Sequence, residues 1–179
     1  METLSLHEAS PGHHFQISIA QEIDELPRFR RFGGQMAYFE GWALYAESLG
    51  KELGLFTDPY SYYGHLSDEM LRAMRLVVDT GMHAQGWSRE QAIDYMMEHS
   101  SMAETDVVAE VERYIAIPGQ ALAYKIGQRE ISALRAEAER RLGERFDLKA
   151  FHRAMLSDGA LPLDVLRRKM EEWIASREA

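Results

Sequence analysis

Residues 7–14 hold the densest group of potential metal ligands in the chain, with the sequence His-Glu-Ala-Ser-Pro-Gly-His-His. Imidazole is the commonest metal ligand in proteins, and a neighbouring glutamate is the usual general base of zinc hydrolases. The stretch departs from the helical His-Glu-x-x-His zinc signature because His13 and His14 come six and seven positions after His7. A regular helix would not align His7 with His13, so we expect the Pro-Gly pair to loop out and bring them together. The simpler alternative is a histidine-rich helix start without a metal.

A third zinc ligand is expected from residues 35–53, where two carboxylates interrupt an otherwise apolar helical pattern. Glu40 and Glu47 are seven positions apart, so they lie on one helix face two turns from each other. Burial of a carboxylate is costly unless the group is paired or binds a metal. One of the two is therefore predicted to be a ligand, and the other to orient a histidine. The alternative is that either side chain is simply solvated.

Composition narrows the kinds of site that the chain can carry. Its 179 residues, 46% of them hydrophobic, suffice for one domain with a core. Cysteine is absent, which excludes disulfides and thiolate ligands. The net charge of −9 argues against nucleic acid as a partner, and no apolar run approaches the roughly 18 residues of a membrane span. A hydrolase without a metal ranks last, because no Gly-x-Ser-x-Gly motif is present.

Apolar residues recur with a helical period along nearly the whole chain, and no segment has a strand pattern. The sequence therefore predicts an all-α fold, a multi-helix bundle forming one domain over residues 1–179. Within it we expect metal-site helices at 1–55, central helices at 58–116 and supporting C-terminal helices at 119–179. A basic connection is expected at 28–34. The predicted helices cover residues 12–25, 35–53, 59–85, 88–99, 103–116, 119–142, 147–156 and 162–176.

Four motifs in order carry a resemblance to a known family. The motif at 7–14 is followed by Glu-Gly-Trp-Ala-Leu-Tyr-Ala-Glu at 40–47, Arg-Leu-Val-Val-Asp-Thr-Gly-Met-His at 75–83 and Pro-Gly-Gln-Ala-Leu-Ala-Tyr-Lys-Ile-Gly at 118–127. Together they resemble the bacterial family called domain of unknown function 885, over essentially the whole chain. Members of that family are several hundred residues long. The resemblance is to their C-terminal third, so we expect this chain to be a piece of a longer protein.

That family in turn resembles the gluzincin metallopeptidases, such as the thimet oligopeptidase and dipeptidyl peptidase III groups. The resemblance implies a helical bundle like the catalytic half of those enzymes, with Zn²⁺ as cofactor. It also implies four functional side chains: the zinc ligands His7, His13 and Glu40, and the general base Glu8. Two extra residues separate the histidines here, so His14 stays an alternative to His13. Glu47 separately stays an alternative to Glu40.

Four further side chains are candidates for stabilising an oxyanion or holding a substrate carboxylate, namely Arg75, His83, Tyr114 and Tyr124. Each has a simpler interpretation. The tyrosines could be core aromatics with satisfied hydroxyls, His83 could cap a helix, and Arg75 could pair with Asp79 one turn later. The three remaining histidines are expected to be solvated or to cap helices: His65, His99 and His152.

The leading hypothesis is a zinc-dependent hydrolase, most simply a metallopeptidase acting on a peptide or small amide. Glu8 would accept a proton as metal-activated water attacks the substrate carbonyl. The rival hypothesis is a catalytically inactive helical binding or interaction module with a degenerate metal site. In that case uncovered apolar surface would favour self-association. The sequence leaves the compartment open, cytoplasmic or exported.

Overall fold

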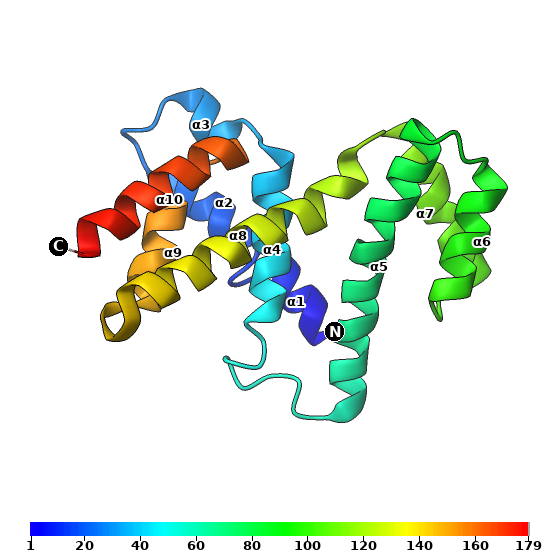
Figure 1. The fold of residues 1–179 in the computed structure, drawn as a ribbon, viewed down its shortest axis with the longest axis horizontal. Coiled ribbons are helices and arrows are strands. Elements are labelled where there is room, and N and C mark those ends of the chain that lie inside the picture. The colour runs from blue at the N-terminus through cyan, green and yellow to red at the C-terminus, as the bar shows by residue number, and fades with distance from the viewer. Residues whose placement is uncertain (179) are drawn as a thin grey trace.

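A computed structural model describes residues 1–178 of the chain, and it is helical throughout (Figure 1). No strand occurs in this described part, which confirms the all-α prediction. The elements are α1 (Glu2–Glu8), α2 (His13–Glu22), α3 (Arg28–Phe32), α4 (Met36–Ser48), α5 (Pro59–Ala84), α6 (Arg89–His99), α7 (Glu104–Ala116), α8 (Gln120–Leu142), the 3₁₀ turn η1 (Gly143–Arg145), α9 (Leu148–Leu156) and α10 (Leu163–Glu178).

Local signals account for several helix boundaries. The Asp58 carboxylate accepts hydrogen bonds from the backbone N–H groups of the first turn of α5, and Pro59 occupies the first position. Ser88 and Gln91 form the expected capping box of α6. Gly143, with φ of 53°, follows the last residue of α8.

Three parts of the helix pattern differ from the sequence prediction by more than a few residues. The segment 2–8 is a helix of its own, α1, which the expected start at residue 12 did not include. The connection predicted at 28–34 contains the short helix α3. Helix α4 ends at Ser48 and not at residue 53, because the N–H groups of Leu49 and Gly50 bond to carbonyls three residues earlier, which begins a turn. Short helices held by neighbouring elements give too weak a periodic signal to be predicted from sequence.

Helices α4 and α8 cross at the centre of the molecule (Figure 1). The crossing is close because two glycines, Gly41 and Gly127, face each other there. A Cβ atom on Gly127 would lie 1.9 Å from the carbonyl oxygen of Ala37, which no side chain could tolerate. The contact places the first turns of α8 beside the part of α4 that carries Glu40.

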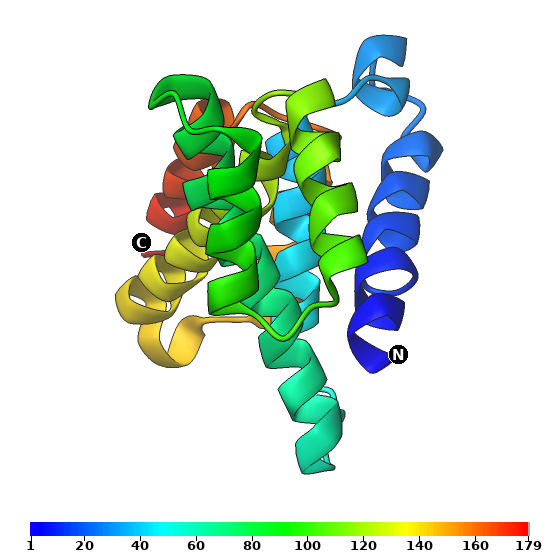
Figure 2. The ribbon, with the colours of Figure 1, turned by 90° about the vertical axis from the view of Figure 1, so that its right-hand side faces the viewer.

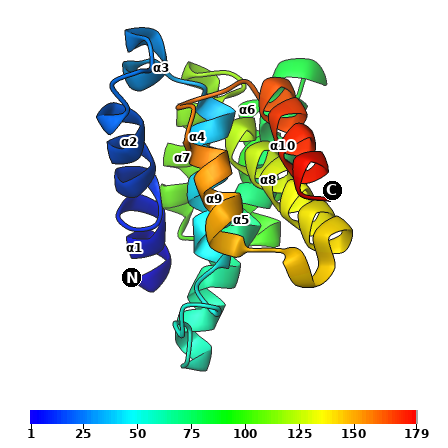
Figure 3. The same ribbon diagram turned by 90° about the vertical axis from the view of Figure 1, so that its left-hand side faces the viewer.

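Two apolar cores lie on either side of this crossing. The first joins α4 to the second half of α8, α9 and α10, and includes Trp42, Ile131 and Phe151. The second joins α5, α6, α7 and the start of α8 around Val78 and Val111. Figure 2 shows α6 and α7 side by side over α5, and Figure 3 shows α1 and α2 running along α4. In residues 1–178, no helix combines the length and apolarity needed to cross a membrane.

Candidate metal centre

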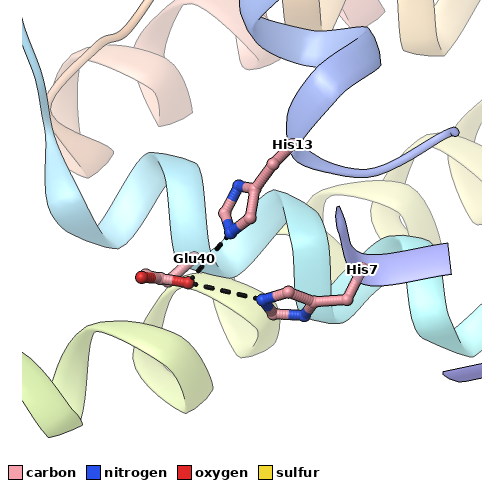
Figure 4. Close-up of side chains that lie close together, drawn as sticks. All are labelled: His7, His13 and Glu40. Atoms are coloured by element: carbon pink, nitrogen blue, oxygen red, sulfur yellow. Dashed lines mark hydrogen bonds and ion pairs between the residues drawn. The ribbon is translucent and has the colours of Figure 1, made fainter. Parts of the chain in front are cut away.

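Three side chains from three different helices meet beside α4: His7 of α1, His13 of α2 and Glu40 of α4 (Figure 4). One ligand atom from each lies within 4.8 Å of the other two. Glu40 Oε2 is 3.2 Å from His13 Nε2 and 3.6 Å from His7 Nε2. The imidazole rings are perpendicular, with centroids 4.7 Å apart. Two imidazole nitrogens and one carboxylate oxygen form a typical ligand set for catalytic zinc.

The junction between α1 and α2 brings the two histidines together. Helix α1 ends at Glu8 and α2 begins at His13, so the Pro-Gly pair separates two helices and does not bulge from one. Gly12 lies so close to α1 that a Cβ atom on it would be 1.9 Å from the carbonyl oxygen of His7. The indole N–H of Trp42 donates to the carbonyl of Pro11 over 2.7 Å and fixes the junction against α4.

His14, the alternative to His13, is exposed on α2 and lies outside the three-residue group. Glu47, the alternative to Glu40, is fully buried, and its Oε1 atom is 2.6 Å from Nδ1 of His7. This hydrogen bond leaves Nε2 of His7 facing Glu40. Glu47 therefore orients a histidine, which is one of the two roles that its spacing from Glu40 allowed.

Arg72 supports Glu47 from α5 and was not singled out by the sequence. Its Nη2 atom donates to Oε1 of Glu47 over 3.2 Å, and its Nη1 atom pairs with Asp68 at 3.2 Å. The only signal for Arg72 in the sequence was that a buried Glu47 needs a counterion, and several arginines could have provided it. The chain Arg72–Glu47–His7 thus fixes one imidazole of the group.

The carboxylates around His7 favour positive charge at this place. Burial opposes the charged imidazole, but hydrogen bonds to Glu40 and Glu47 raise the pKa of His7 to about 9. Burial likewise opposes ionisation of Glu40, yet hydrogen bonds from His13 and His7 lower the pKa of Glu40 to about 2. Glu40 is therefore ionised at neutral pH, and the site is electrostatically suited to a cation.

A second layer of polar residues meets Glu40 from the start of α8. Gln120 Nε2 donates to Glu40 Oε1 over 3.4 Å, and Gln120 Oε1 accepts from Nη2 of Arg113 over 2.9 Å. Arg113 also donates to the hydroxyl of Tyr124 over 3.0 Å. The ring of Tyr124 stacks near-parallel to that of His7, with centroids 6.3 Å apart. Tyr124 was a sequence candidate, whereas Gln120 was visible only as part of the motif at 118–127 and Arg113 had no distinguishing signal.

Arg75 packs on the ring of Tyr124, and Tyr114 holds Arg75 in place. Arg75 Nε donates to the Tyr114 hydroxyl over 3.1 Å, and Arg75 Nη2 pairs with Glu110 at 2.9 Å. The Tyr114 hydroxyl itself donates to Glu110, and the Arg75 guanidinium lies 4.5 Å from the ring centre of Tyr124. Burial and Glu110 raise the pKa of Tyr114, although Arg75 opposes this. Arg75 therefore pairs with Glu110, while Asp79 accepts from the backbone N–H of Gly119.

Two sequence candidates lie outside the group of three. Glu8 is exposed at the end of α1, and in residues 1–178 no hydrogen bond or ion pair joins it to His7, His13 or Glu40. Its role as a base stays a prediction. His83 is exposed near the end of α5, with Nε2 3.0 Å from the carbonyl oxygen of Tyr114. It links α5 to α7 and does not approach the three ligands.

The expectation for the three remaining histidines is wrong for two of them. His65 is buried and stacks on Phe56 with ring centroids 4.7 Å apart. His152 is half-buried, and its Nε2 atom is 2.7 Å from the hydroxyl of Tyr45. Both pack against aromatic rings whose tertiary positions the sequence did not indicate. His99 is exposed, with Nδ1 close to the Tyr95 carbonyl one turn earlier, as a helix-end residue would be.

Comparison with known proteins identifies the family. The family model described as "Bacterial protein of unknown function (DUF885)" matches residues 1–170. The chain belongs to the DUF885 family. A crystal structure of a "putative lipoprotein" from Colwellia psychrerythraea is 52% identical with a TM-score of 0.94, over 97% of this chain and 30% of that one. A "putative lipoprotein of unknown function" from Shewanella oneidensis is 31% identical with a TM-score of 0.85, over 94% of this chain and 31% of that one.

This DUF885 chain therefore spans less than a third of the length of these two relatives. No curated protein matches it. The family description assigns no activity, so the chemistry has to be argued from the side chains themselves.

Proposed function

We propose that this DUF885 chain binds Zn²⁺ through His7, His13 and Glu40 and forms the metal site of a metallohydrolase, most simply a gluzincin-like metallopeptidase. The observation that carries the proposal is the convergence of three ligand atoms within 4.8 Å of one another, from three separate helices. Exposed acidic side chains often cluster without binding a metal ion. Here one imidazole is buried and its second nitrogen is already held by Glu47.

The donor set fits zinc in its chemistry. His7 has Nδ1 bound to Glu47, which leaves Nε2 as the ligand atom, and Glu40 supplies a negative charge. Three protein ligands are the number used by catalytic zinc sites, which keep a further position for water or substrate. Zinc at such a position acts as a Lewis acid on water or on a substrate carbonyl.

Three residues of the protein would orient the ligand His7, donate a hydrogen bond to the substrate and accept a proton. Glu47, fixed by Arg72, holds His7 in the orientation that presents Nε2. The Tyr124 hydroxyl accepts from Arg113 and lies beside Glu40, and its proton would turn from Glu40 to a substrate carbonyl oxygen. Glu8, exposed beside His7 in the sequence, would accept the proton lost by the attacking water. Peptides or small amides are the proposed substrates.

Zinc titration of the purified chain tests the metal site. We expect His13→Gln to weaken zinc binding by more than about 100-fold, beyond the effect typical of a residue that only orients a ligand. His14→Gln is the matched control, because it removes the neighbouring exposed imidazole and should leave the affinity unchanged. A zinc concentration of about 100 times Kd should stabilise the parent chain by about 2.7 kcal/mol.

Two results would contradict this assignment. One is a parent chain without measurable zinc affinity, which would favour the inactive helical binding module. The other is an equal loss of affinity in His13→Gln and His14→Gln. For the hydrolytic step, Glu8→Gln in the longest natural chain that contains this sequence should retain zinc and lose peptide hydrolysis. Retained hydrolysis would remove Glu8 from the role of base.

A further inference from the structure

Arg113 is a guanidinium at the solvent edge of the candidate metal centre. From α7 it donates to the Tyr124 hydroxyl over 3.0 Å and to Gln120 Oε1 over 2.9 Å, and Gln120 in turn contacts Glu40. Its side chain is 35% exposed. Arg113 thus combines contact with the hydrogen-bond network of the centre and access to solvent.

The two other arginines near the centre do not have this access. The Arg75 side chain is 6% exposed, with Nε bound to Tyr114 and Nη2 bound to Glu110. The Arg72 side chain is 12% exposed and is paired with Glu47 and Asp68. Both act on other residues of the protein. Arg75 was one of four sequence candidates for binding an oxyanion or a substrate carboxylate, but its burial leaves Arg113 as the more accessible arginine.

The positive charge of Arg113 is only partly compensated. Its nearest carboxylate, Glu110, is 2.9 Å from Nη2 of Arg75 and 3.5 Å from Nη1 of Arg113. One carboxylate therefore serves two guanidiniums, and the contact with Arg113 is at the limit of a hydrogen bond. Asp79 of α5 is bound to the backbone N–H of Gly119.

We infer that Arg113 binds the free α-carboxylate of a peptide substrate, with Gln120 and Tyr124 fixing the guanidinium from behind. Nε and Nη1 lie on different edges of the guanidinium, so the carboxylate would accept one charge-assisted hydrogen bond, from the weakly used Nη1 of Arg113. The substrate class is then a short peptide, or the C-terminus of a longer one, cleaved close to its carboxylate. Cleavage of such a substrate rests on the proposed zinc hydrolase activity. Binding of its carboxylate by Arg113 does not require catalysis.

The experiment compares N-acetyl-alanyl-alanine with its C-terminal amide as probes. These compounds differ in the carboxylate alone, and their binding to the zinc-free and zinc-loaded chain is followed by ¹H–¹⁵N NMR. We expect the acid to bind at least about tenfold more tightly than the amide in both forms, with shifts at the Arg113 side chain, because a charge-assisted pair is lost in the amide. Arg113→Gln should abolish the preference, and Arg113→Lys should retain part of it because the charge remains.

Arg89→Gln is the matched control. Arg89 is a half-exposed arginine on α6 that pairs with Glu112 of α7 at 2.5 Å, and its removal should leave the preference for the acid unchanged. Equal binding of acid and amide by the parent chain would overturn the inference, as would an undiminished preference in Arg113→Gln. Neither result depends on zinc affinity. The proposed zinc site is tested separately, by the titration that includes His13→Gln.

Discussion

The two halves of α8 pass through different kinds of interior. From residue 129 to 178, every buried residue is apolar or a glycine, and the core there is built from α8, α9 and α10. From residue 1 to 128 the interior also contains nine buried polar or charged side chains, among them His7, Glu40, Glu47, Arg75 and Asp79. Three of these side chains, His7, Glu40 and Glu47, meet beside α4 near its crossing with α8.

This difference indicates that one part of the interior supplies stability and the other supplies reactive groups. We call residues 129–178 the apolar half and residues 1–128 the polar half. Buried apolar side chains supply most of the free energy of folding, whereas a buried ion pair often contributes nothing net compared with well-packed apolar residues. Within residues 1–178, buried atoms without a hydrogen-bond partner include Glu47 Oε2 and Arg72 Nε in the polar half and Glu130 Oε1 in the other, each costing about 1–3 kcal/mol. An interior of this kind is typical of a functional site supported by a separate stable core.

Weakening the apolar half should have the largest effect on stability and none on the metal. Phe151 is fully buried, and Phe151→Ala should lower the free energy of unfolding by about 3–5 kcal/mol. The zinc affinity of the remaining folded protein should not change. Chemical denaturation and zinc titration measure the two quantities. Ile174→Val, a milder change in the same core, guards against complete unfolding, and a fall in zinc affinity in either variant would contradict the separation.

Opening the helix crossing should affect both halves together. In Gly127→Ala the new methyl group would lie 1.9 Å from the Ala37 carbonyl, so α4 and α8 must move apart. We expect a loss of about 1–3 kcal/mol in stability and weaker zinc binding, because Glu40 lies on the displaced helix. Gly64→Ala is the control, since a Cβ there meets open space on α5 and should stabilise that helix slightly.

Changing the partner of His7 should affect the metal site alone. Glu47→Gln keeps the shape of the side chain but removes the charge that holds His7 Nδ1. We expect zinc affinity to fall by about 10–100-fold, as is usual for residues that orient a metal ligand. Glu52→Gln is the control at the exposed end of the same segment. Unchanged zinc affinity in Glu47→Gln would show that His7 does not need this partner.

The last effect is confined to acid pH and concerns the stability of the apolar half. Burial and the nearby Arg135 lower the pKa of His152 from 6.5 to about 4. Since the unfolded chain takes up the proton more readily, the stability from neutral His152 is present above pH 6.5 and is lost between pH 6.5 and 4. Thermal melts across this range should show a smaller loss in His152→Gln. Parallel profiles for parent and variant would exclude the contribution of His152.

The helical class and most helix positions could be predicted, because apolar period, caps and glycines act locally. Asp58, Ser88 and Gly143 mark helix boundaries within a few residues of their own positions. The short helices α1 and α3 were missed because isolated segments of that length are unstable alone and exist through contacts with the rest of the fold. Likewise the choice between His13 and His14 depends on how α2 leaves the Gly12 junction.

The sequence alone determined which chemistry was available. It offered histidines and carboxylates without cysteine, and left His13 or His14 and Glu40 or Glu47 as ligands beside His7, a choice that the family resemblance made for His13 and Glu40. Only the tertiary structure decided which groups surround them. Arg72, Arg113 and Gln120 come from three other helices, and their contacts depend on the crossing of α4 and α8. Spacing within a helix constrains neighbours one or two turns away, whereas contacts between helices depend on packing over the whole fold.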